Sequence, residues 1–440
     1  MAATEFAEDA AVTPAHHGKV GVLGAGALVA GSMVGSGVYL LPATLGAIGS
    51  ISILGWGAAT LAALAIAGLF AWLGGAAPDA KGLPGYVQAG AGPFFGVQTT
   101  VAYWSCSAVG NVAIALAVAG AAGYFLPALN ATGPRLAVTL AATWLSIAAA
   151  WIGPRMVARL EGLTLGIGLL PVALAATVGW FWFHPSIFIG AWNPQGLSLT
   201  GALGASALNA FWAFLGVECA AATAAVVRDP ARNVPRATLA GVVGVAILYV
   251  AACTALMGVL PSTALAASTA PFADAAKATL GLGMAGAIAA CALLRAQGCL
   301  TGWTLVAAET TRGAADEGVF PAAFRTRPGE KTSPINLVAV GGVMSLTAVL
   351  TASPTLAQQF TTVANVAVLL ALYAYCLAGV SLLRLGRAFT PGRRLAASLT
   401  ALAAMGASIA LIASAKPVEL ALALVPPAIA ALLYLWLRRR

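Results

Sequence analysis

The stretch GSMVGSGVYLLP, residues Gly31–Pro42, lies inside an otherwise apolar run and carries three glycines and two serines. In hydrocarbon, an unpaired backbone N–H or C=O costs several kcal/mol, so unwound backbone survives there only when protein buries it or when it lines a cavity. We therefore expect a broken helix that offers main-chain groups to a small polar ligand. A second candidate break is FWAFLGVE, residues Phe211–Glu218. Two interrupted spans at corresponding points of two halves are typical of the binding site of a secondary transporter.

The composition predicts an all-α polytopic membrane protein. Hydrophobic residues make up 60% of the chain, charged residues make up 8%, and the mean hydropathy is +0.93. A span needs roughly 20 apolar residues, and the chain accommodates about twelve of them. We expect the spans near residues 20–46, 50–75, 92–126, 134–153, 160–182, 202–226, 236–260, 279–307, 334–353, 358–383, 395–414 and 418–437.

The basic residues predict the orientation, because Lys and Arg favour cytoplasmic loops. With both termini inside, most of the 22 Lys and Arg face the cytoplasm. The opposite side receives Arg135, Lys277 and Lys416, and Arg295 lies within a span. The net charge of +9 thus reflects topology, and we expect no nucleic-acid partner. The expected location is the inner membrane of a bacterial cell.

We expect one transmembrane domain over residues 19–440, preceded by a disordered cytoplasmic tail over residues 1–18 that is not a signal peptide. The longest polar stretch, Arg312–Pro334, is interpreted as a loop. About five spans separate the two candidate breaks, and an odd number inverts the second copy. This spacing predicts inverted repeats near 20–182 and 202–383, followed by two extra helices near 395–437. The six cysteines are scattered singly, so they are interpreted as small apolar residues, and no metal or cofactor is expected.

The first break supplies candidate ligand groups of both signs. Main-chain N–H groups at Gly35, Ser36 and Gly37 begin the following half-helix, where the helix dipole favours a carboxylate. Carbonyl groups around Met33 favour an ammonium. The alternative is close helix packing through small residues, which is common in membranes.

Glu218 is the one acid expected in the interior of a span, and an ionisable residue there is a functional hypothesis by default. Because burial disfavours its charged form and a cationic ligand favours it, we expect protonation and ligand binding to be coupled. A structural carboxylate bonded to a neighbouring hydroxyl is the alternative.

Aromatic and polar residues within the spans complete the candidates. Aromatic faces attract cations, and four such residues lie away from the membrane interfaces, with ordinary packing as the alternative: Tyr103, Trp212, Trp303 and Tyr375. Asn111 either bonds a neighbouring helix or contacts a ligand. Arg295 should repel a cationic ligand unless it faces an acid or snorkels.

Several of these segments resemble the amino acid–polyamine–organocation superfamily, and within it the bacterial exchangers of basic amino acids for their decarboxylation products. The resemblance extends from Lys19 over nearly the whole chain. It includes Val34–Pro42, Tyr103-Trp104 with Gly110-Asn111, Gly179–Phe183, Trp212–Glu218, Asn233–Pro235, Ala270–Phe272 and Gly302–Thr304.

The resemblance implies a twelve-helix homodimeric antiporter that works by alternating access and performs no enzymatic step. It implies a substrate carboxylate at Ser36 and Gly37, and an α-ammonium at the carbonyls of Met33, Trp212 and Leu215. The distal cation is implied to lie against Trp303, near Cys106, Ser107 and Asn111. Tyr103, Glu218 and Tyr375 are implied to form an outer gate with a proton-sensitive carboxylate.

The favoured substrate pair from the resemblance is arginine and agmatine, with a role in acid resistance or amine export. Departures such as Ala108, Ala367 and Leu215 leave other readings open. The alternatives are an ornithine–putrescine or lysine–cadaverine exchanger, or a proton-coupled amino acid importer. A channel or a membrane-embedded transferase is disfavoured, because interior acids and histidines are sparse.

Overall fold

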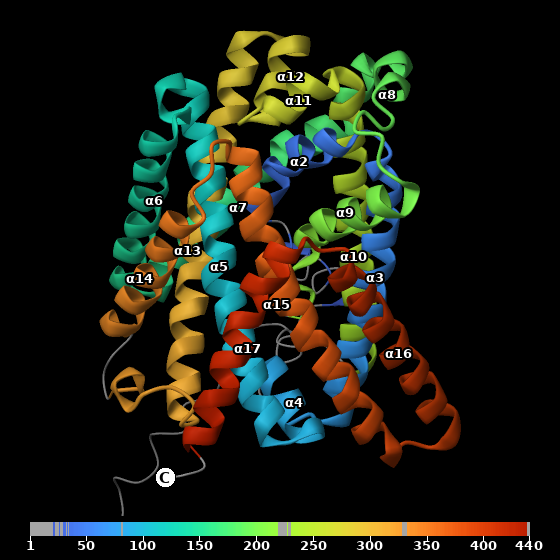
Figure 1. Cartoon of the computed structure of the whole chain (residues 1–440), viewed down its shortest axis with the longest axis vertical. Helices are drawn as coiled ribbons and strands as arrows, with labels where there is room; N and C mark the ends of the chain where they lie inside the picture. The colour runs from blue at the N-terminus through green and yellow to red at the C-terminus, as the bar shows by residue number, and fades with distance from the viewer. Residues whose placement is uncertain are drawn as a thin grey trace, which may run out of the picture.

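The computed structural model describes residues 21, 22, 26, 30, 31, 33, 35–80, 82–218, 227, 230–327 and 332–437. The predicted tail at residues 1–18 lies outside this part of the chain. The described chain is a bundle of long, mostly upright helices, and short helices cap its upper end (Figure 1). This confirms the predicted all-α membrane fold.

Nine helices among the described residues are long and apolar enough to cross a bilayer, judged by length and composition. They include, with adjoining turns, α3 (Ser52–Ala76), α5 (Pro93–Phe125), α6 (Thr132–Ile152), α7 (Pro154–Thr177), α10 (Pro230–Val259), α13 (Leu282–Asp316), α15 (Leu356–Leu385), α16 (Pro391–Ala413) and α17 (Pro417–Leu437). Two shorter apolar helices are Leu199–Phe214, which comprises α9 (Leu199–Phe211) and η4 (Trp212–Phe214), and α14 (Pro334–Leu350). The remaining expected span is the first one in the chain, near 20–46, and the structure describes only part of it.

Shorter elements cap and connect these helices. They are η1 (Ser36–Tyr39), α2 (Leu41–Ile48), α4 (Gly82–Ala91), η2 (Pro127–Asn130), η3 (Val178–Trp182), α8 (Pro185–Gly190), α11 (Ser262–Ala267), α12 (Pro271–Leu280), η6 (Ala322–Phe324) and η7 (Gly386–Ala388). The expectation of a loop from Arg312 onward is wrong by about a turn, because α13 continues to Asp316. The ion pair between Arg312 and Glu309 lies on this last part of α13.

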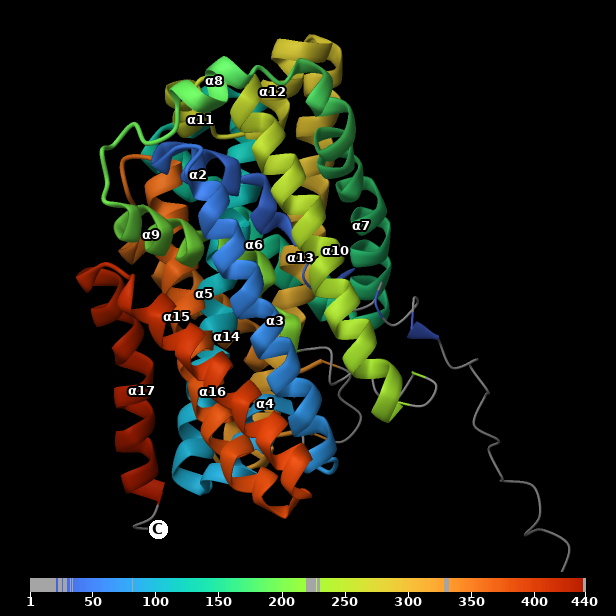
Figure 2. The ribbon, with the colours of Figure 1, turned by 90° about the vertical axis from the view of Figure 1, so that its right-hand side faces the viewer.

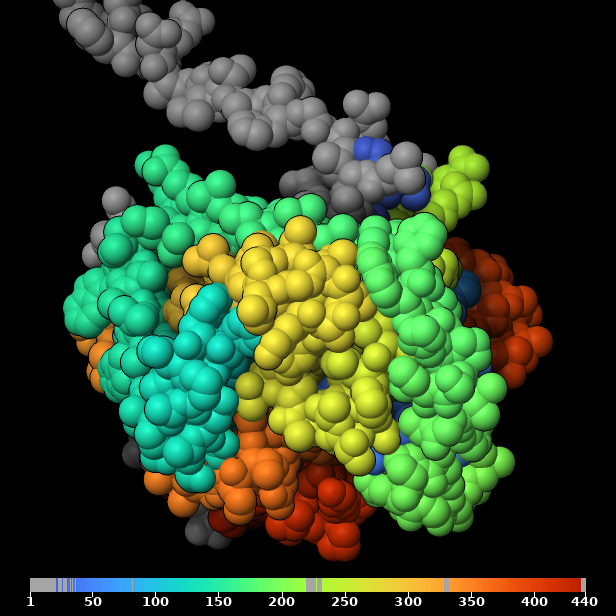
Figure 3. Space-filling view, turned by 90° about the horizontal axis from the view of Figure 1, so that it is seen from above, coloured from blue at the N-terminus to red at the C-terminus, as the bar shows by residue number. Residues whose placement is uncertain are grey.

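The two ends of the bundle differ. Beside the lower end of α15, Ser381 and Arg384 donate to the carbonyls of Val87 and Ala91 in α4, at 3.4 and 3.3 Å. Figure 1 shows α4 and the C-terminus at that end and α2, α11 and α12 at the other. Seen from above, the yellow α11–α12 segment crosses the middle of the molecule (Figure 3). Under the orientation predicted from the charges, the α4 end is cytoplasmic.

The most buried helices enclose the two breaks. Most residues of α5 between Gly96 and Gly123 are buried, and α15 is buried along most of its length. By contrast, α16 and α17 lie on the outside of the bundle (Figure 2) and expose many leucines. An apolar exterior is what lipid contact requires, since lipid tails solvate leucine as well as a protein core does.

Candidate functional site: a pocket at two helix breaks

The first break occurs where the sequence predicts it. Gly35 is extended (φ −97°, ψ −169°), and residues Ser36–Tyr39 form a 3₁₀ turn before α2 begins at Leu41. The backbone N–H of Gly35 donates to the Met33 carbonyl at 2.8 Å. The turn therefore presents the peptide groups of Ser36 and Gly37 at the start of the following helix.

The second break follows α9. After the 3₁₀ turn Trp212–Phe214, Leu215 is extended (φ −60°, ψ 138°) and Gly216 has a φ of +101°. A side chain at Gly216 would be strained, because L-residues rarely adopt that region. Both predicted breaks are confirmed, although the remainder of the second span, residues 219–226, lies outside the described part of the chain.

A pocket with an empty volume of about 620 Å³ lies between these breaks. Its walls are Met33, Gly35, Gly37, Val38, Tyr103, Cys106, Ser107, Gly110, Asn111, Ile114, Trp212, Ala213, Leu215, Glu218, Tyr249, Cys299 and Trp303. Two candidates, Ser36 and Tyr375, are not among the lining residues. Ser36 is the first residue of η1, and Tyr375 is fully buried and donates a hydrogen bond to Glu218.

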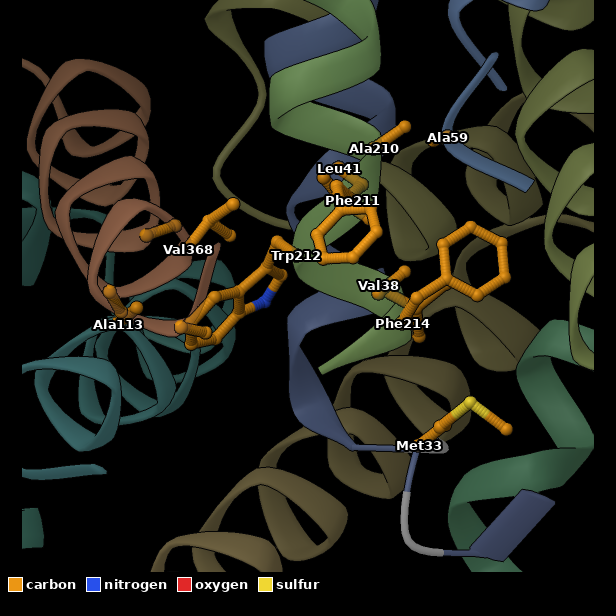
Figure 4. Close-up of a cluster of buried hydrophobic side chains, with 14 of the residues drawn as sticks. Met33, Val38, Leu41, Ala59, Ala113, Ala210, Phe211, Trp212, Phe214 and Val368 are labelled. Atoms are coloured by element: carbon orange, nitrogen blue, oxygen red, sulfur yellow. The ribbon is translucent and has the colours of Figure 1, made fainter. Parts of the chain in front are cut away.

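Trp212 fits between two glycines. A Cβ on Gly37 would overlap the indole nitrogen of Trp212 and lie 2.6 Å from its Cδ1 atom. The far edge of the ring lies 3.3 Å from the Cβ position of Gly110, and Phe360 packs edge-on against the ring at 6.1 Å. Figure 4 shows Trp212 at the end of α9, between the first broken helix and Ala113 of α5. The absence of side chains at Gly37 and Gly110 thus fixes where the indole lies.

Glu218 accepts three hydrogen bonds. The hydroxyl of Tyr375 donates to its Oε2 atom at 2.6 Å, the hydroxyl of Tyr103 donates to Oε1 at 3.1 Å, and the Gly216 N–H donates to Oε2 at 3.1 Å. Among the lining residues it is the one Asp or Glu. The predicted grouping of Tyr103, Glu218 and Tyr375 is therefore present in the structure.

The direction of the helices decides which end of the pocket this cluster occupies. Tyr103 lies in the first third of α5 and Tyr375 lies two thirds of the way along α15. The start of α5 and the end of α15 both adjoin α4. This end is cytoplasmic under the predicted orientation. The expected outer gate and the orientation predicted from the charges therefore disagree, because that orientation places Glu218 on the inner side of the pocket.

The Met33 carbonyl accepts two internal hydrogen bonds. Besides the Gly35 N–H, the hydroxyl of Tyr249 donates to it at 3.3 Å. A carbonyl oxygen has two lone pairs, so an ammonium at this position has to replace one of these donors. Sequence reasoning missed Tyr249, because nothing local on α10 shows that its hydroxyl reaches the first break. Cys299 was also missed, although it lies one turn before Trp303 on α13.

Asn111 is 1% exposed and lines the pocket. Its Nδ2 group contacts the Met344 Sδ atom at 3.9 Å. The amide is therefore oriented by α14, and its carbonyl oxygen remains as the acceptor for a donor in the pocket. Nearby, the Ser107 hydroxyl donates to the Tyr103 carbonyl at 3.1 Å and keeps its oxygen lone pairs.

A family model described as "Amino acid permease" matches residues 20–435 of the chain. The chain belongs to this amino acid permease family. The resemblance to the amino acid–polyamine–organocation superfamily is thereby confirmed, while nothing in the match specifies arginine.

Curated permeases with similar sequences are named for amine transport. The putrescine transporter PotE of Escherichia coli K12 is 31% identical over 375 residues, which is 84% of each chain. PotE of Haemophilus influenzae is 29% identical over 83% of this chain and 84% of its own. The cadaverine/lysine antiporter of E. coli K12 is 35% identical over 306 residues, 70% of this chain and 69% of its own. This permease is accordingly a multi-pass membrane transporter and not an enzyme.

Replacing Trp303 by leucine in this permease should weaken substrate binding by about 1–3 kcal/mol, because a pocket aromatic covers the alkyl stem and attracts the cation. Competition binding with a radiolabelled substrate measures the loss. Trp151→Leu is the matched control, since Trp151 is 53% exposed on α6 and lies away from the lining residues. Equal affinities of the wild-type protein and Trp303→Leu would remove Trp303 from the site.

Proposed function

We propose that this permease exchanges a cationic amino acid for its decarboxylated amine by alternating access in the bacterial inner membrane. The observation that carries the proposal is the pocket itself, where two stretches of broken backbone meet a single carboxylate and the indoles of Trp212 and Trp303. Backbone N–H groups suit a carboxylate, whereas the acid and the aromatic faces suit cations. The names of the similar permeases support the same class of cargo.

The favoured pair is an amino acid with a terminal alkylammonium and its diamine, such as lysine with cadaverine or ornithine with putrescine. A guanidinium has five N–H donors in a planar fork, and an alkylammonium has three. The lining acceptors for the distal cation are Asn111, Ser107 and the carboxylate of Glu218. Because that carboxylate already accepts three hydrogen bonds, this set fits the smaller number of donors better. The arginine–agmatine pair, which the resemblance favours, is the alternative that the test below includes.

The test is exchange in proteoliposomes that contain the full-length permease. Uptake of a labelled amino acid should require an amine inside the vesicle, and each amine should drive uptake of its parent amino acid best. A competition panel of lysine, cadaverine, ornithine, putrescine, arginine and agmatine then ranks the pairs. Uptake into empty vesicles along a proton gradient would identify a proton-coupled importer instead. If arginine and agmatine compete more strongly than the other pairs, the favoured pair is wrong.

Asn111→Ala should weaken lysine and cadaverine binding about tenfold, because a hydrogen bond to a charged group contributes about 1.5–3 kcal/mol. Norleucine, which lacks the distal ammonium, provides the comparison within the same variant. We expect its weaker affinity to stay the same. If Asn111→Ala lowers norleucine and lysine affinity equally, the amide serves helix packing and not recognition of the distal cation.

Three further parts of the proposal come from the charges, the spacing and the resemblance. They are cytoplasmic termini, inverted repeats near 20–182 and 202–383, and a homodimeric assembly. Accessibility labelling of single cysteines in the α4–α5 turn and in the α11–α12 turn tests the orientation. If an impermeant reagent added outside intact cells labels the α4–α5 turn, the predicted orientation is reversed.

A further inference from the structure

Arg295 is a buried charge that the proposed exchange does not yet use. It is 2% exposed on α13, and its aliphatic stem packs against Gly168 of α7, where a Cβ would lie 2.7 Å from the arginine Cδ atom. Arginine is almost never fully buried unless it is paired, since moving its charge out of water is expensive.

Its position along α13 relates it to the pocket. Cys299 and Trp303 line the pocket and follow Arg295 by one and two helical turns on the same face. The Sγ atom of Cys299 lies 3.3 Å from the Cβ position of Gly35, at the first break. Arg295 therefore lies roughly 6 Å further along the axis than Cys299, at the end of the pocket away from Trp303.

The groups around Arg295 include the first break. Tyr39 and Tyr249 lie within electrostatic range of Arg295, and so does Glu161 on α7. Tyr39 ends the 3₁₀ turn that begins at Ser36, and its hydroxyl donates to the Gly168 carbonyl at 2.5 Å. The thiols of Cys253, Cys291 and Cys299 are further titratable groups around Tyr39 and Tyr249. The positive charge is thus adjacent to the turn whose N–H groups are proposed to receive the substrate carboxylate.

The acids lie toward the opposite end. The carboxylate of Glu161 on α7 packs against Gly302, with its Oε2 atom 2.6 Å from the Cβ position. Gly302 is seven residues beyond Arg295 on α13, which is roughly 10 Å along the axis. Glu218 lies at the α4 end of the pocket. Arg295 therefore lies behind one end of the pocket, and at the other end Glu218 lines the pocket while Glu161 lies outside the lining residues.

We propose that Arg295 sets the preference of the permease for an amino acid over its decarboxylated amine, an inference that rests on the proposed exchange function. The two cargoes differ by one carboxylate. The amino acid presents that carboxylate to the end where Arg295 lies, and its distal cation to the end with Glu161 and Glu218. The amine lacks the negative group, so Arg295 attracts nothing in it and repels its nearer ammonium. Arg295 thus determines specificity through the effect of its charge on the substrate carboxylate, although Arg295 itself does not line the pocket.

The test compares affinities of the full-length protein for lysine and cadaverine, measured by competition against labelled lysine. Arg295→Met should lower the affinity ratio of lysine to cadaverine on the order of tenfold, the size expected of a unit charge acting over roughly 10 Å in a partly buried site. Arg295→Lys should keep the wild-type ratio. Arg135→Met is the matched control, because Arg135 is buried on α6 and donates to the carbonyls of Asn130, Ser353 and Pro354.

Equal losses of lysine and cadaverine affinity in Arg295→Met would overturn the inference and leave Arg295 a packing residue. If Arg295→Met does not fold, Arg295→Met/Glu161→Gln removes the buried acid together with the base, and the same ratio decides the outcome. Wild-type protein that binds neither lysine nor cadaverine would instead refute the proposed function, which is a separate result from an unchanged ratio in the variant.

Discussion

Gly37→Ala should abolish measurable exchange while leaving a folded permease. The added methyl group would occupy the position of the Trp212 indole nitrogen, so the indole has to leave its place between Gly37 and Gly110. Overpacking of a tight site costs about 1–3 kcal/mol, which a membrane bundle of this size tolerates. The displaced ring would enter the pocket and block the substrate, so we expect binding to weaken by about 2 kcal/mol or more.

Competition binding and the thermal midpoint in detergent check both parts of this expectation. Gly57→Ala is the control, because Gly57 lies on α3 with nothing within 4 Å of its Cβ position. Alanine there should leave both quantities unchanged or slightly raise the midpoint. A Gly37→Ala protein with wild-type affinity would show that the position of Trp212 does not matter for binding.

Glu218→Gln should reduce exchange by about one to two orders of magnitude, because the carboxylate holds a hydrogen-bonded cluster at the pocket wall. The carboxylate accepts from Tyr103, Tyr375 and the Gly216 N–H, whereas a glutamine amide has one acceptor oxygen and a donor NH₂. At least one of the three donors then loses its partner, and a bond to a charged group contributes about 1.5–3 kcal/mol. The substrate cation also loses the one carboxylate that lines the described pocket.

The measurement is the initial exchange rate in proteoliposomes. Glu309→Gln is the control, because Glu309 lies six residues beyond Trp303 on α13, is not among the pocket-lining residues and pairs with Arg312. It should keep the wild-type rate. A Glu218→Gln protein that exchanges at the wild-type rate would show that exchange does not need the carboxylate.

The parts of the fold that depend on local sequence could be predicted. Apolar runs bounded by Gly, Pro and charge locate α3, α5, α6 and α14–α17 to within a few residues, because a span needs a minimum apolar length. The glycine-rich segment around Gly35 and the FLG sequence around Gly216 mark the breaks. Gly216 has a φ of +101°, which L-residues rarely adopt, whereas Gly35 is extended. These signals lie within a few consecutive residues.

The remaining features depend on contacts between distant helices. That Tyr249 donates to Met33 is set by how α10 packs against the first break, and no pattern on α10 carries that information. The sequence does not explain a charged residue such as Arg295 within an apolar span. The explanation lies on another helix, where Gly168 leaves room for the aliphatic stem of Arg295. The side of the membrane on which Tyr103, Glu218 and Tyr375 lie is a separate matter. Hydrogen bonds join the three side chains, but their side of the membrane follows from helix direction, which no local pattern carries.

The Leu199–Phe214 segment separates membrane insertion from folding. Its 16 residues, α9 and the turn η4 together, cover about 24 Å of a hydrocarbon core of about 30 Å, and extended backbone follows at Leu215. The apolar sequence continues beyond Leu215 to Val227, so the translocon meets a run long enough to insert. In the folded protein, Ser206 of α9 packs against Gly55 of α3 at a distance that leaves no room for a Cβ. Bulky residues at Gly55 should therefore spare membrane integration during synthesis and lower the thermal midpoint of the assembled permease.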